Sequence, residues 1–501
     1  MPIAHRVPEL VGRGGWIGTA DGFTMAALRG RVVVLFFWAD GDVASLRVAE
    51  ELRRLDHRHA EDVVVIGVHT ARFPGTDHTD VVTATARQRP AYPVLDDPEA
   101  ATASAFGVGS WPTVVLVDQR GRRHDSFVGE GHAVSLGQAV TDLLEADPRR
   151  RRHLAIPAPP TVPEPLAFPS KVAVSADGRR LAIADTGHDR VVVCTLDGLV
   201  LAVYTGFVRP NGVRFDGRGV VVCDTVPGRI VRSNGEVLAD AIASPWDLVS
   251  AGDGSWVVAE AGGHRLVRVR PGEISTRVAA GTGAEGHLDG PDVQAELSQP
   301  MGVARTAEGI VFTDAGTGAL RRLRRDRRRG DVTTLSAGAM LAPAGVAASP
   351  DGGPVFVADT RNSRLLRFDG ESLAVLDVAG LDHPGGLDLL ADGRLVVADT
   401  DNHRVVVVDP ATGAVQAVEL DETWVHAVDG TPFSAAAGEA LSVPVALDLV
   451  DEALEPPLQV TVEARPRQLL DGGPRRVELD GTTGTVELRA GRPGTGLVLV
   501  E

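Results

Sequence analysis

The order of apolar and polar positions divides the chain into four parts, and the first part alternates strands with helices. The continuous apolar runs "VVVLFFW" and "VVVIGV" are typical of strands that are covered on both faces of a sheet. Between them, apolar residues recur at helical spacing from Asp42 to His59. With the later run "PTVVLVD", the hairpin "HDSFVGEG" and helical patterns at 78–89 and 136–144, the order becomes β-α-β-α-β-β-α. This order predicts a single α/β domain over residues 1–147.

Residues 148–168 differ in composition from this domain and form a connection. They contain four consecutive arginines, from Arg149 to Arg152, and six prolines lie between Pro157 and Pro169. Proline at this density favours an extended and semi-rigid backbone, because it fixes one of the two backbone dihedral angles. We therefore expect a linker whose arginines face solvent.

The third part, residues 169–434, is a run of six similar segments. Each begins with a proline and a short strand, turns at a glycine, and ends a second strand in an acid, as in "PGGLDLLADGRLVVADTDNHRVV". A repeat of about forty residues with room for four strands predicts a six-bladed β-propeller. In five segments an arginine follows the acid by five residues: Asp185 with Arg190, Asp224 with Arg229, Glu260 with Arg265, Asp359 with Arg364, and Asp399 with Arg404.

The repeated acid and arginine flank the tight turn between two strands of each segment. A guanidinium group held on a carboxylate would fix the geometry of this turn in every blade. Because the pair recurs, we interpret it as part of the architecture and not as a catalytic pair. The fourth segment departs from the pattern, since Asp314 is followed by Ala319 at the arginine position and by Arg321 two positions later.

The last part, residues 435–501, contains the alternating runs "LQVTVEA", "RRVELDG", "TGTVELRA" and "GLVLVE". Alternation with a period of two, interrupted by Gly and Pro, predicts a small antiparallel β module.

Taken together, the four parts resemble the bacterial relatives of NHL-repeat-containing protein 2, a family that joins a thioredoxin-like domain to an NHL β-propeller and a C-terminal β module. The resemblance is carried by "LRGRVVVLFFW", "VVVIGVHTARFP", "YPVLDDP", "FGVGSWPTVVLVDQRG" and the repeated "ADT" turns. It covers nearly the whole chain. It implies a multidomain fold: a thioredoxin-like α/β domain, an all-β six-bladed NHL propeller and a small C-terminal β module.

The chain departs from this family at the position of its chemistry. The family pattern continues from the aromatic pair into a CxxC turn, and the resemblance places Asp42 and Ser45 at the two thiol positions. Disulfide exchange requires a thiolate that attacks sulfur, so these residues exclude it at this turn. We expect Asp42 to cap the helix that begins there. The resemblance also implies that Pro112, in "SWPT", is cis and faces the turn.

A second hypothesis for this region is a surface that has acquired another use. Trp38, Asp40, His69 and Trp111 could line a groove that holds a peptide. His69 follows a buried strand at its C-terminal end, where α/β folds place functional groups, although a lone histidine is more often structural.

Two further segments carry clusters of charge. If the run "RRLRRDRRR" is an exposed hairpin tip, it could bind an anionic ligand, RNA or an acidic peptide through Arg321, Arg322, Arg324, Arg325, Arg327, Arg328 and Arg329. The loop "GTGAEGHLDGPDVQAELSQP" could bind a cation through Glu285, His287, Asp289 and Asp292. Its Gly-rich turns favour a structural loop instead.

Composition and charge narrow the choice of function. A formal net charge of −17 argues against general binding to nucleic acid or to an anionic membrane. No basic-then-apolar leader and no apolar run near about 18 residues is present, so we expect a cytoplasmic protein. The two cysteines, Cys194 and Cys223, lie in apolar strand-like runs outside any CxxC or metal-ligand spacing, which is typical of small buried residues.

These observations favour a redox-inactive scaffold that binds a protein, a peptide or a small ligand at the domain cleft or the propeller axis. We expect no cofactor and no metal, and the sequence leaves the oligomeric state open. Two alternatives stay open. One is a metal-dependent hydrolase or lyase in the propeller, because several six-bladed propellers that this one resembles are such enzymes. The other is a thiol-disulfide oxidoreductase-family protein with a degenerate active site.

Overall fold

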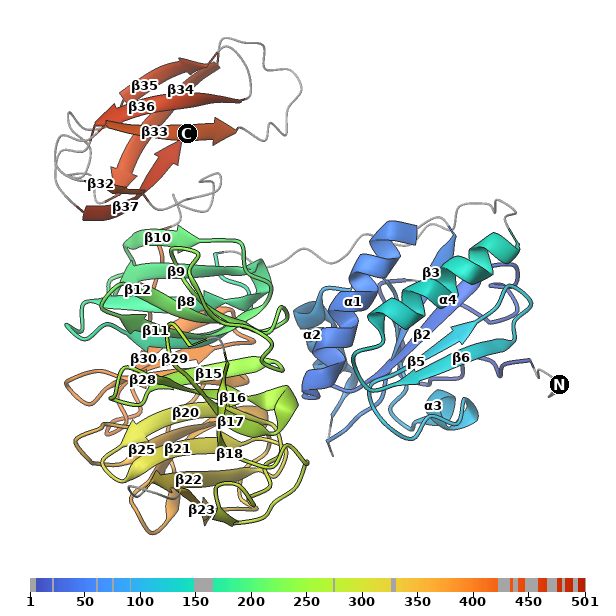
Figure 1. Ribbon diagram of the computed structural model, residues 1–501, viewed down its shortest axis with the longest axis horizontal. Coiled ribbons are helices and arrows are strands. Elements are labelled where there is room, and N and C mark those ends of the chain that lie inside the picture. The colour runs from blue at the N-terminus through green and yellow to red at the C-terminus, as the bar shows by residue number, and fades with distance from the viewer. Residues whose placement is uncertain are drawn as a thin grey trace. The chain divides into compact units, whose positions relative to one another are not determined.

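The chain divides into two compact units, Met1–Val162 and Pro163–Glu501, in the computed structural model (Figure 1). The structure describes residues 6–19, 22–59, 62–73, 76–90, 92–147, 165–273, 275–325 and 330–421, and then the backbone of strands at 433–435, 440–446, 458–465, 475–479, 483–489 and 494–500. Among these residues, no helix is long and apolar enough to cross a membrane.

The first unit contains a six-stranded sheet with the order β1-β4-β3-β2-β5-β6. Strands β2, β3 and β4 are parallel neighbours, whereas β1, β5 and β6 are antiparallel to their partners. The strands are β1 Gly15–Ile17, β2 Val32–Trp38, β3 Val63–His69, β4 Val94–Asp96, β5 Thr113–Val117 and β6 Arg123–Val128. The sheet is the thioredoxin-like arrangement expected from the sequence, with β1 and β4 added at one edge.

Helices cover both faces of this sheet, which explains why β2 is apolar at every position. They are α1 Val43–His59, α2 His78–Gln88, α3 Ala101–Ala105 and α4 Ala133–Ala146. Alternate residues of β2, such as Val34 and Phe36, pack in one core with α1, α2 and α4. The residues between them, such as Leu35, pack in a second core with α3. Successive side chains of a strand point to opposite faces, so a strand buried on both faces is a continuous apolar run.

The second unit contains six four-stranded blades, the fourth of which has one extra short strand. The first blade contains β7 Pro169–Val174, β8 Arg180–Asp185, β9 Arg190–Thr195 and β10 Val200–Tyr204, and the second contains β11 Pro210–Asp216, β12 Gly219–Asp224, β13 Arg229–Arg232 and β14 Val237–Ala239. The third blade contains β15 Pro245–Ser250, β16 Trp256–Glu260, β17 Arg265–Val269 and β18 Arg277–Ala280, and the fourth contains β19 Gly290–Pro291, β20 Pro300–Thr306, β21 Gly309–Asp314, β22 Ala319–Arg325 and β23 Gly330–Ser336. The fifth blade contains β24 Gly345–Ala347, β25 Val355–Asp359, β26 Arg364–Phe368 and β27 Leu373–Val375, and the sixth contains β28 Pro384–Leu389, β29 Leu395–Asp399, β30 Arg404–Val408 and β31 Val415–Ala417.

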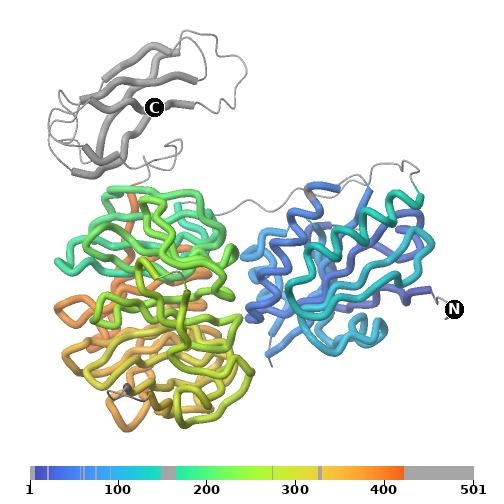
Figure 2. The backbone as a smooth tube through the Cα atoms, in the orientation of Figure 1, coloured from blue at the N-terminus to red at the C-terminus, as the bar shows by residue number. Residues whose placement is uncertain are grey.

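The first strands of the six blades form a closed ring. Each lies beside the first strand of the next blade, in the order β7, β11, β15, β20, β24 and β28, and β28 lies beside β7. In Figure 2 the orange sixth blade and the green first blade are therefore neighbours, although 179 residues separate them in the sequence (first blade 169–204, sixth blade 384–417). Each of these two blades takes all four of its strands from one continuous segment.

A buried acid at the end of the second strand fixes the turn in each blade. One oxygen of Asp185 accepts a hydrogen bond from Arg190 Nε at 2.7 Å, and the other accepts from the Ala167 backbone N–H at 2.7 Å. The same pair of bonds recurs at Asp224, Glu260, Asp359 and Asp399, each with the arginine five residues later. The expected acid–arginine pairs are therefore present, and each also ties the start of its blade to the turn.

The threonine that follows the acid in four blades joins neighbouring blades. Its hydroxyl donates to the carbonyl of the proline that opens the next blade, as Thr186 does to Pro210 at 2.6 Å. Thr225 and Thr360 repeat the bond. Thr400 donates to the Pro169 carbonyl at 2.8 Å, so the sixth blade is joined to the first by the same contact.

The last strands form a separate β arrangement. They are β32 Phe433–Ala435, β33 Ala440–Ala446, β34 Leu458–Arg465, β35 Arg475–Leu479, β36 Thr483–Arg489 and β37 Gly494–Val500. All their pairings are antiparallel, in the orders β32-β37-β34-β35 and β33-β36. Because β32 pairs with β37, Phe433 and Ser434 belong to these strands and not to the propeller where the sequence placed them.

Replacing Arg404 with Ala should destabilise the propeller by about 2 kcal/mol, because the fully buried Asp399 would lose its charged hydrogen-bond donor. Denaturant unfolding followed by tryptophan fluorescence measures this change. Arg394→Ala is the control in the same blade, since Arg394 pairs with the exposed Asp392 and should change stability little. Equal effects of the two substitutions would contradict the role assigned to the buried acid.

Candidate functional site

The turn between β2 and α1 contains the two residues at the expected thiol positions. Asp42 Oδ2 accepts hydrogen bonds from the Ser45 backbone N–H at 2.8 Å and from Ser45 Oγ at 2.5 Å. Ser45 is the third residue of α1 and is fully buried. The Asp42 carboxylate thus caps the helix, as expected, and it meets the partial positive charge at the helix N-terminus.

The backbone of this turn is held from two sides. Gly41 has φ +76°, and a side chain on it would collide with the Phe73 ring. Arg72 Nη1 donates to the Gly41 carbonyl at 3.4 Å and lies 3.8 Å from Asp42 Oδ1. The turn is therefore fixed by residues that follow β3 as well as by the helix that it starts.

Two of the residues expected to line a groove are buried, so that part of the prediction is wrong. Trp38 is 1% exposed and packs edge-to-face on the His69 ring, with ring centroids 4.6 Å apart. His69 is 0% exposed, and its Nε2 accepts from the Asp40 backbone N–H at 3.4 Å. Both residues lie at the ends of central strands, beneath the turn. They support its shape and cannot contact a ligand at the surface.

His69 also faces the second charged group at this end of the sheet. Asp96, the last residue of β4, lies 3.9 Å from His69 Nδ1 and 2.8 Å from His78 Nδ1. Burial would raise the pKa of Asp96, but its contacts with the two histidines outweigh burial and lower it. The group is a buried structural contact between β3, β4 and α2.

Trp111 is the exposed residue of the Trp111–Pro112 pair, whereas Pro112 beside it is buried. The Trp111–Pro112 peptide bond is cis, as the resemblance implied. Because Phe37 pairs with Thr113, Pro112 and Trp38 lie at the same end of the adjacent strands β2 and β5. The Trp111 side chain is 36% exposed, and Val128, which pairs with Thr113 from the edge strand β6, is 58% exposed.

Carboxylates surround this exposed edge. Glu130 follows β6 and lies 3.3 Å from Arg47 Nη1 of α1. Burial raises the pKa of Glu130, Arg47 lowers it, and the charge of Asp42 raises it further. Burial likewise raises the pKa of Glu51, with Arg47 acting against it and Glu130 adding to it. The Glu130 carboxylate therefore interacts with Arg47 and with the carboxylates of Glu51 and Asp42. Glu130 was not among the site residues predicted from the sequence. Its position two residues after the hairpin strand β6, at the same end of the sheet as Pro112, could have indicated it.

The arginine-rich run of the fourth blade is not a free anion-binding patch in the residues that the structure describes. Arg321 is 0% exposed, and Arg322 and Arg324 both pair with Glu308. The structure describes the backbone of Arg325, while Arg327, Arg328 and Arg329 lie outside the described residues. The predicted role is wrong for Arg321 and is not supported for Arg322 and Arg324.

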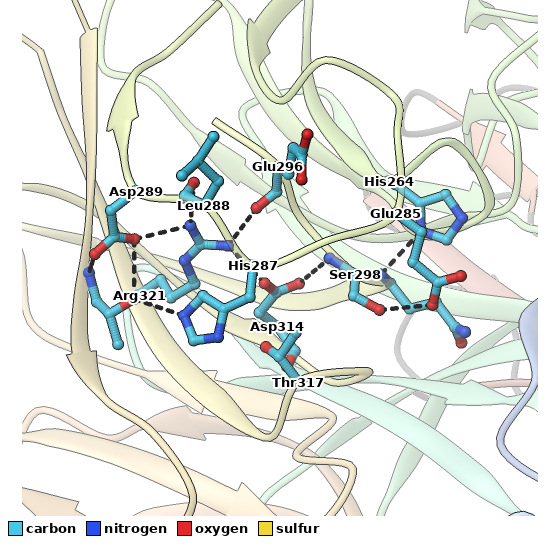
Figure 3. A network of polar contacts seen from close by, with 12 residues as sticks. His264, Glu285, His287, Leu288, Asp289, Glu296, Ser298, Asp314, Thr317 and Arg321 are labelled. Carbon is cyan, nitrogen blue, oxygen red and sulfur yellow. Dashed lines mark hydrogen bonds and ion pairs between the residues drawn. The ribbon is translucent and has the colours of Figure 1, made fainter. Parts of the chain in front are cut away.

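Arg321 instead replaces the arginine that the fourth blade lacks at position 319 (Figure 3). Its Nη1 donates to Asp314 Oδ2 at 2.7 Å and to the Glu296 carbonyl at 2.8 Å. Its Nη2 donates to Asp289 Oδ1 and to the Leu288 carbonyl, both at 2.8 Å. Ala319 pairs with Asp314 in the strand register, so a residue two positions later, on the same face of β22, reaches back to the acid.

The polar side chains of the loop before the fourth blade form hydrogen bonds and ion pairs within the chain. Asp289 binds Arg321 and Thr334, and His287 lies 2.9 Å from Thr334 Oγ1. Glu285 accepts from Ser298 Oγ at 2.8 Å, and Asp292 accepts from the Gly330 backbone N–H. These contacts, most of which Figure 3 shows, favour the structural interpretation of the loop.

The cysteines and one further cluster lie elsewhere in the propeller. Cys194 and Cys223 are fully buried, and burial raises the pKa of Cys194 to about 12. Both thiols are therefore inert. Asp382, His383 and Asp401 bring possible metal-ligand atoms together, but His383 Nδ1 lies 2.8 Å and 3.1 Å from the two carboxylates and can donate to them. Contacts between its own side chains account for the proximity of these three residues.

The stability of the propeller should depend on pH through Asp314 in the fourth blade. Burial raises the pKa of Asp314 from 3.8 to about 6, although Arg321 lowers it. The folded chain therefore holds this proton more tightly than the unfolded chain. The stabilisation that results from this tighter proton binding is fully present below pH 3.8 and is lost as the pH rises through about 6.

Between pH 4 and pH 7 this change amounts to roughly 2–3 kcal/mol. Thermal unfolding of the propeller should therefore show a weaker dependence on pH over this range in Asp314→Asn than in the unsubstituted protein. Asp392→Asn, at an exposed carboxylate, is the control. The same pH dependence in all three proteins would refute the assignment.

Comparison with known proteins places these features in a family context. A family model described as thioredoxin-like matches residues 30–123, and a model of the NHL repeat matches residues 381–408. NHL repeat-containing protein 2 of Gallus gallus is 27% identical over 514 residues, which cover 81% of this chain and 70% of that protein. The Homo sapiens protein of the same name is 25% identical over 569 residues, with 88% and 78% covered.

Among solved structures, a streptogramin B lyase matches 54% of this chain and 86% of its own, with 11% identity and a TM-score of 0.39. The relatives match over most of the chain, and in this chain the thioredoxin-like match precedes the NHL-repeat match. The chain is a homologue of NHL repeat-containing protein 2, built from a thioredoxin-like domain and a six-bladed NHL propeller.

Proposed function

We propose that this protein is a polypeptide-binding scaffold whose thioredoxin-like domain performs no thiol chemistry. The observation that carries the proposal is the hydrogen-bonded pair of Asp42 and Ser45 at the two thiol positions. A carboxylate and a buried hydroxyl cannot form the mixed disulfide that exchange requires. Both side chains also bind each other, so the helix N-terminus that would activate a thiolate is satisfied by Asp42.

The exposed edge beside this turn supports polypeptide binding. Trp111 and Val128 are exposed where β5 begins and β6 ends, and β6 is an edge strand of the sheet. An edge strand offers unpaired backbone groups to an extended peptide, and exposed aromatic side chains are enriched at protein interfaces. Glu130 and Glu51 lie near Arg47, and Asp42 lies near Arg72. The partly exposed Glu130 carboxylate at this edge is the group that would receive a basic side chain of an extended polypeptide.

The propeller axis supports the scaffold over a metal-dependent enzyme. Such an enzyme needs carboxylates that converge on the axis and remain available to an ion. Asp247 and Asp388, on the first strands of the third and sixth blades, are instead held by Lys171 at 2.6 Å and by Arg214 at 2.8 Å. In the part of the propeller that the structure describes, the protein's own cations neutralise these axial acids.

The unsubstituted protein should not reduce insulin in the presence of dithiothreitol, as measured by the turbidity of the released B chain. The double variant Asp42→Cys/Ser45→Cys should gain activity, because it places a dithiol at a helix N-terminus that lowers the pKa of a thiol. The single variant Asp42→Cys, which lacks the second thiol, is the matched control. Insulin reduction by the unsubstituted protein would overturn the redox-inactive part of the proposal.

A library of short random peptides displayed on phage and selected on the full chain tests the binding role. We expect enrichment of sequences that combine an apolar residue with Arg or Lys. Binding of the enriched peptides, measured by fluorescence polarisation, should fall about tenfold or more in Trp111→Ala and also in Glu130→Gln. It should persist in Val375→Ala, which removes an exposed apolar side chain of the propeller. Failure to enrich any peptide, or equal binding by all variants, would contradict the proposal.

A further inference from the structure

The chain contains one lysine among its 50 lysines and arginines, and that lysine is buried. Lys171 is 3% exposed on β7, the first strand of the first blade. It occupies the third position of the motif that opens every blade, a proline followed by two residues. In four blades the third residue is glycine, namely Gly212, Gly302, Gly345 and Gly386, and in the third blade it is Asp247. The two departures from glycine are the two members of one ion pair.

The glycines explain how this ion pair reaches across the ring. Lys171 Nζ lies 2.6 Å from Asp247 Oδ2, so the pair joins the first and third blades past the second. A Cβ on Gly386 would lie 2.2 Å from Lys171 Cδ, and a Cβ on Gly212 would lie 2.8 Å from Asp247 Cα. Side chains at these two positions would collide with the pair. Glycine in the neighbouring blades therefore leaves the space that the lysine and the aspartate occupy.

A second ion pair extends this contact to other blades. Arg214 Nη1 donates to Asp388 Oδ2 at 2.8 Å, and Arg214 Nε donates to the Leu248 carbonyl at 3.2 Å. Asp388 Oδ2 also accepts from the Val174 backbone N–H at 2.9 Å. We call Lys171, Asp247, Arg214 and Asp388 the axial brace. Through Asp388 and Val174, it crosses the contact where the sixth blade meets the first.

The third blade also joins the fourth through this brace, because Asp247 Oδ2 accepts from the Val303 backbone N–H at 3.2 Å. The brace thus connects the first strands of the first, second, third, fourth and sixth blades. Lys171 and Asp247 are buried, and buried polar groups are costly unless every partner is present. The ammonium group of Lys171 is the partner that neutralises Asp247.

The energetics of the pair indicate what the lysine contributes. Burial lowers the pKa of Lys171 more than the charge and hydrogen bond of Asp247 raise it. A buried ion pair of this kind adds little net stability over an apolar pair, but the loss of one partner leaves an uncompensated charge. The lysine is therefore required because Asp247 is present. Its head group is the smallest side-chain cation with three N–H donors.

We propose that the space around Asp247 is a binding site for a primary ammonium ion. The Lys171 side chain permanently occupies this site, and its contact with Asp247 holds together the ring formed by the first strands of the blades. Truncating the side chain at Cβ leaves a channel with the length of its last three carbons and its ammonium group. n-Propylammonium has these atoms in the same order. The site should therefore accept n-propylammonium from solution when Lys171 is replaced with Ala.

The test is chemical rescue of Lys171→Ala in the full chain. We expect the unfolding midpoint of the propeller to fall by about 10 °C relative to the unsubstituted protein. n-Propylammonium chloride should restore part of this loss in a saturable manner. Tetramethylammonium, which has no N–H donor, and sodium chloride at equal ionic strength should not restore it.

The double variant Lys171→Ala/Asp247→Asn is the matched control. It lacks the uncompensated carboxylate, so it should be more stable than Lys171→Ala and should not respond to n-propylammonium. The proposal is overturned if Lys171→Ala is as stable as the unsubstituted protein. It is also overturned if tetramethylammonium or Mg²⁺ rescues as well as n-propylammonium, or if the double variant responds equally.

Amine labelling of the unsubstituted protein tests the same site if Lys171→Ala does not fold. An N-hydroxysuccinimide ester should not modify Lys171 in the native protein, and unfolding in guanidinium chloride should add one label at Lys171. Peptide mass spectrometry locates the labels. Labelling of Lys171 in the native protein at the rate seen in the unfolded protein would overturn the proposal. Both experiments are independent of polypeptide binding by the thioredoxin-like domain.

Discussion

The propeller depends on a carboxylate that is buried at the end of the second strand of every blade. Each acid uses one oxygen for an arginine and the other for a backbone N–H near the start of the same blade. A buried carboxylate with both partners is stable, whereas one that lacks its cation is costly. This constraint explains the fourth blade, where Ala319 takes the usual arginine position and Arg321 reaches the same acid from two residues away. The requirement is for a guanidinium group on the acid and not for an arginine at one sequence position.

The sixth and first blades are joined by the same kinds of hydrogen bond that join other neighbouring blades. Residues directly before the opening prolines have positive φ, as in Phe168, Gln299 and His383. This conformation is unfavourable for residues other than glycine and persists only where the surroundings hold it. The backbone N–H of Gln299 donates to His264 of the preceding blade, and that of Phe168 donates in the same way to His403 of the sixth blade. Closure thus needs no special strand exchange, and the axial brace adds contacts across the centre.

In the thioredoxin-like unit, a carboxylate and a hydroxyl lie at the turn where the family pattern has two thiols. The N-terminus of α1 still offers unpaired N–H groups and a partial positive charge. In this chain Asp42 satisfies them, with Ser45 bound to the same oxygen. His69 and Trp38 support the turn from below, and Trp111 stays exposed beside the cis peptide bond. This turn, with a carboxylate and a hydroxyl in place of two thiols, is the basis for proposing recognition as the role of this domain.

The sequence by itself determined the two folds, because the evidence for them is local. Continuous apolar runs such as β2 predict strands buried on both faces, and the six acid turns recur at a spacing that fixes the number of blades. It also determined the absence of thiols at the turn, and the cap on α1 follows from one aspartate at a helix start.

Only the tertiary structure decided which side chains are exposed and which charges meet. Trp38 and His69 look like site residues in the sequence, but helices and strands from distant segments bury them. Arg321 lies in a run that reads as a basic patch, yet a loop more than thirty residues earlier supplies Asp289 as one of its partners. Lys171 and Asp247 are 76 residues apart, and only the packing of successive blades around the axis brings them together. Burial and ion pairing depend on contacts between distant segments, and a periodic pattern along one segment carries no information about them.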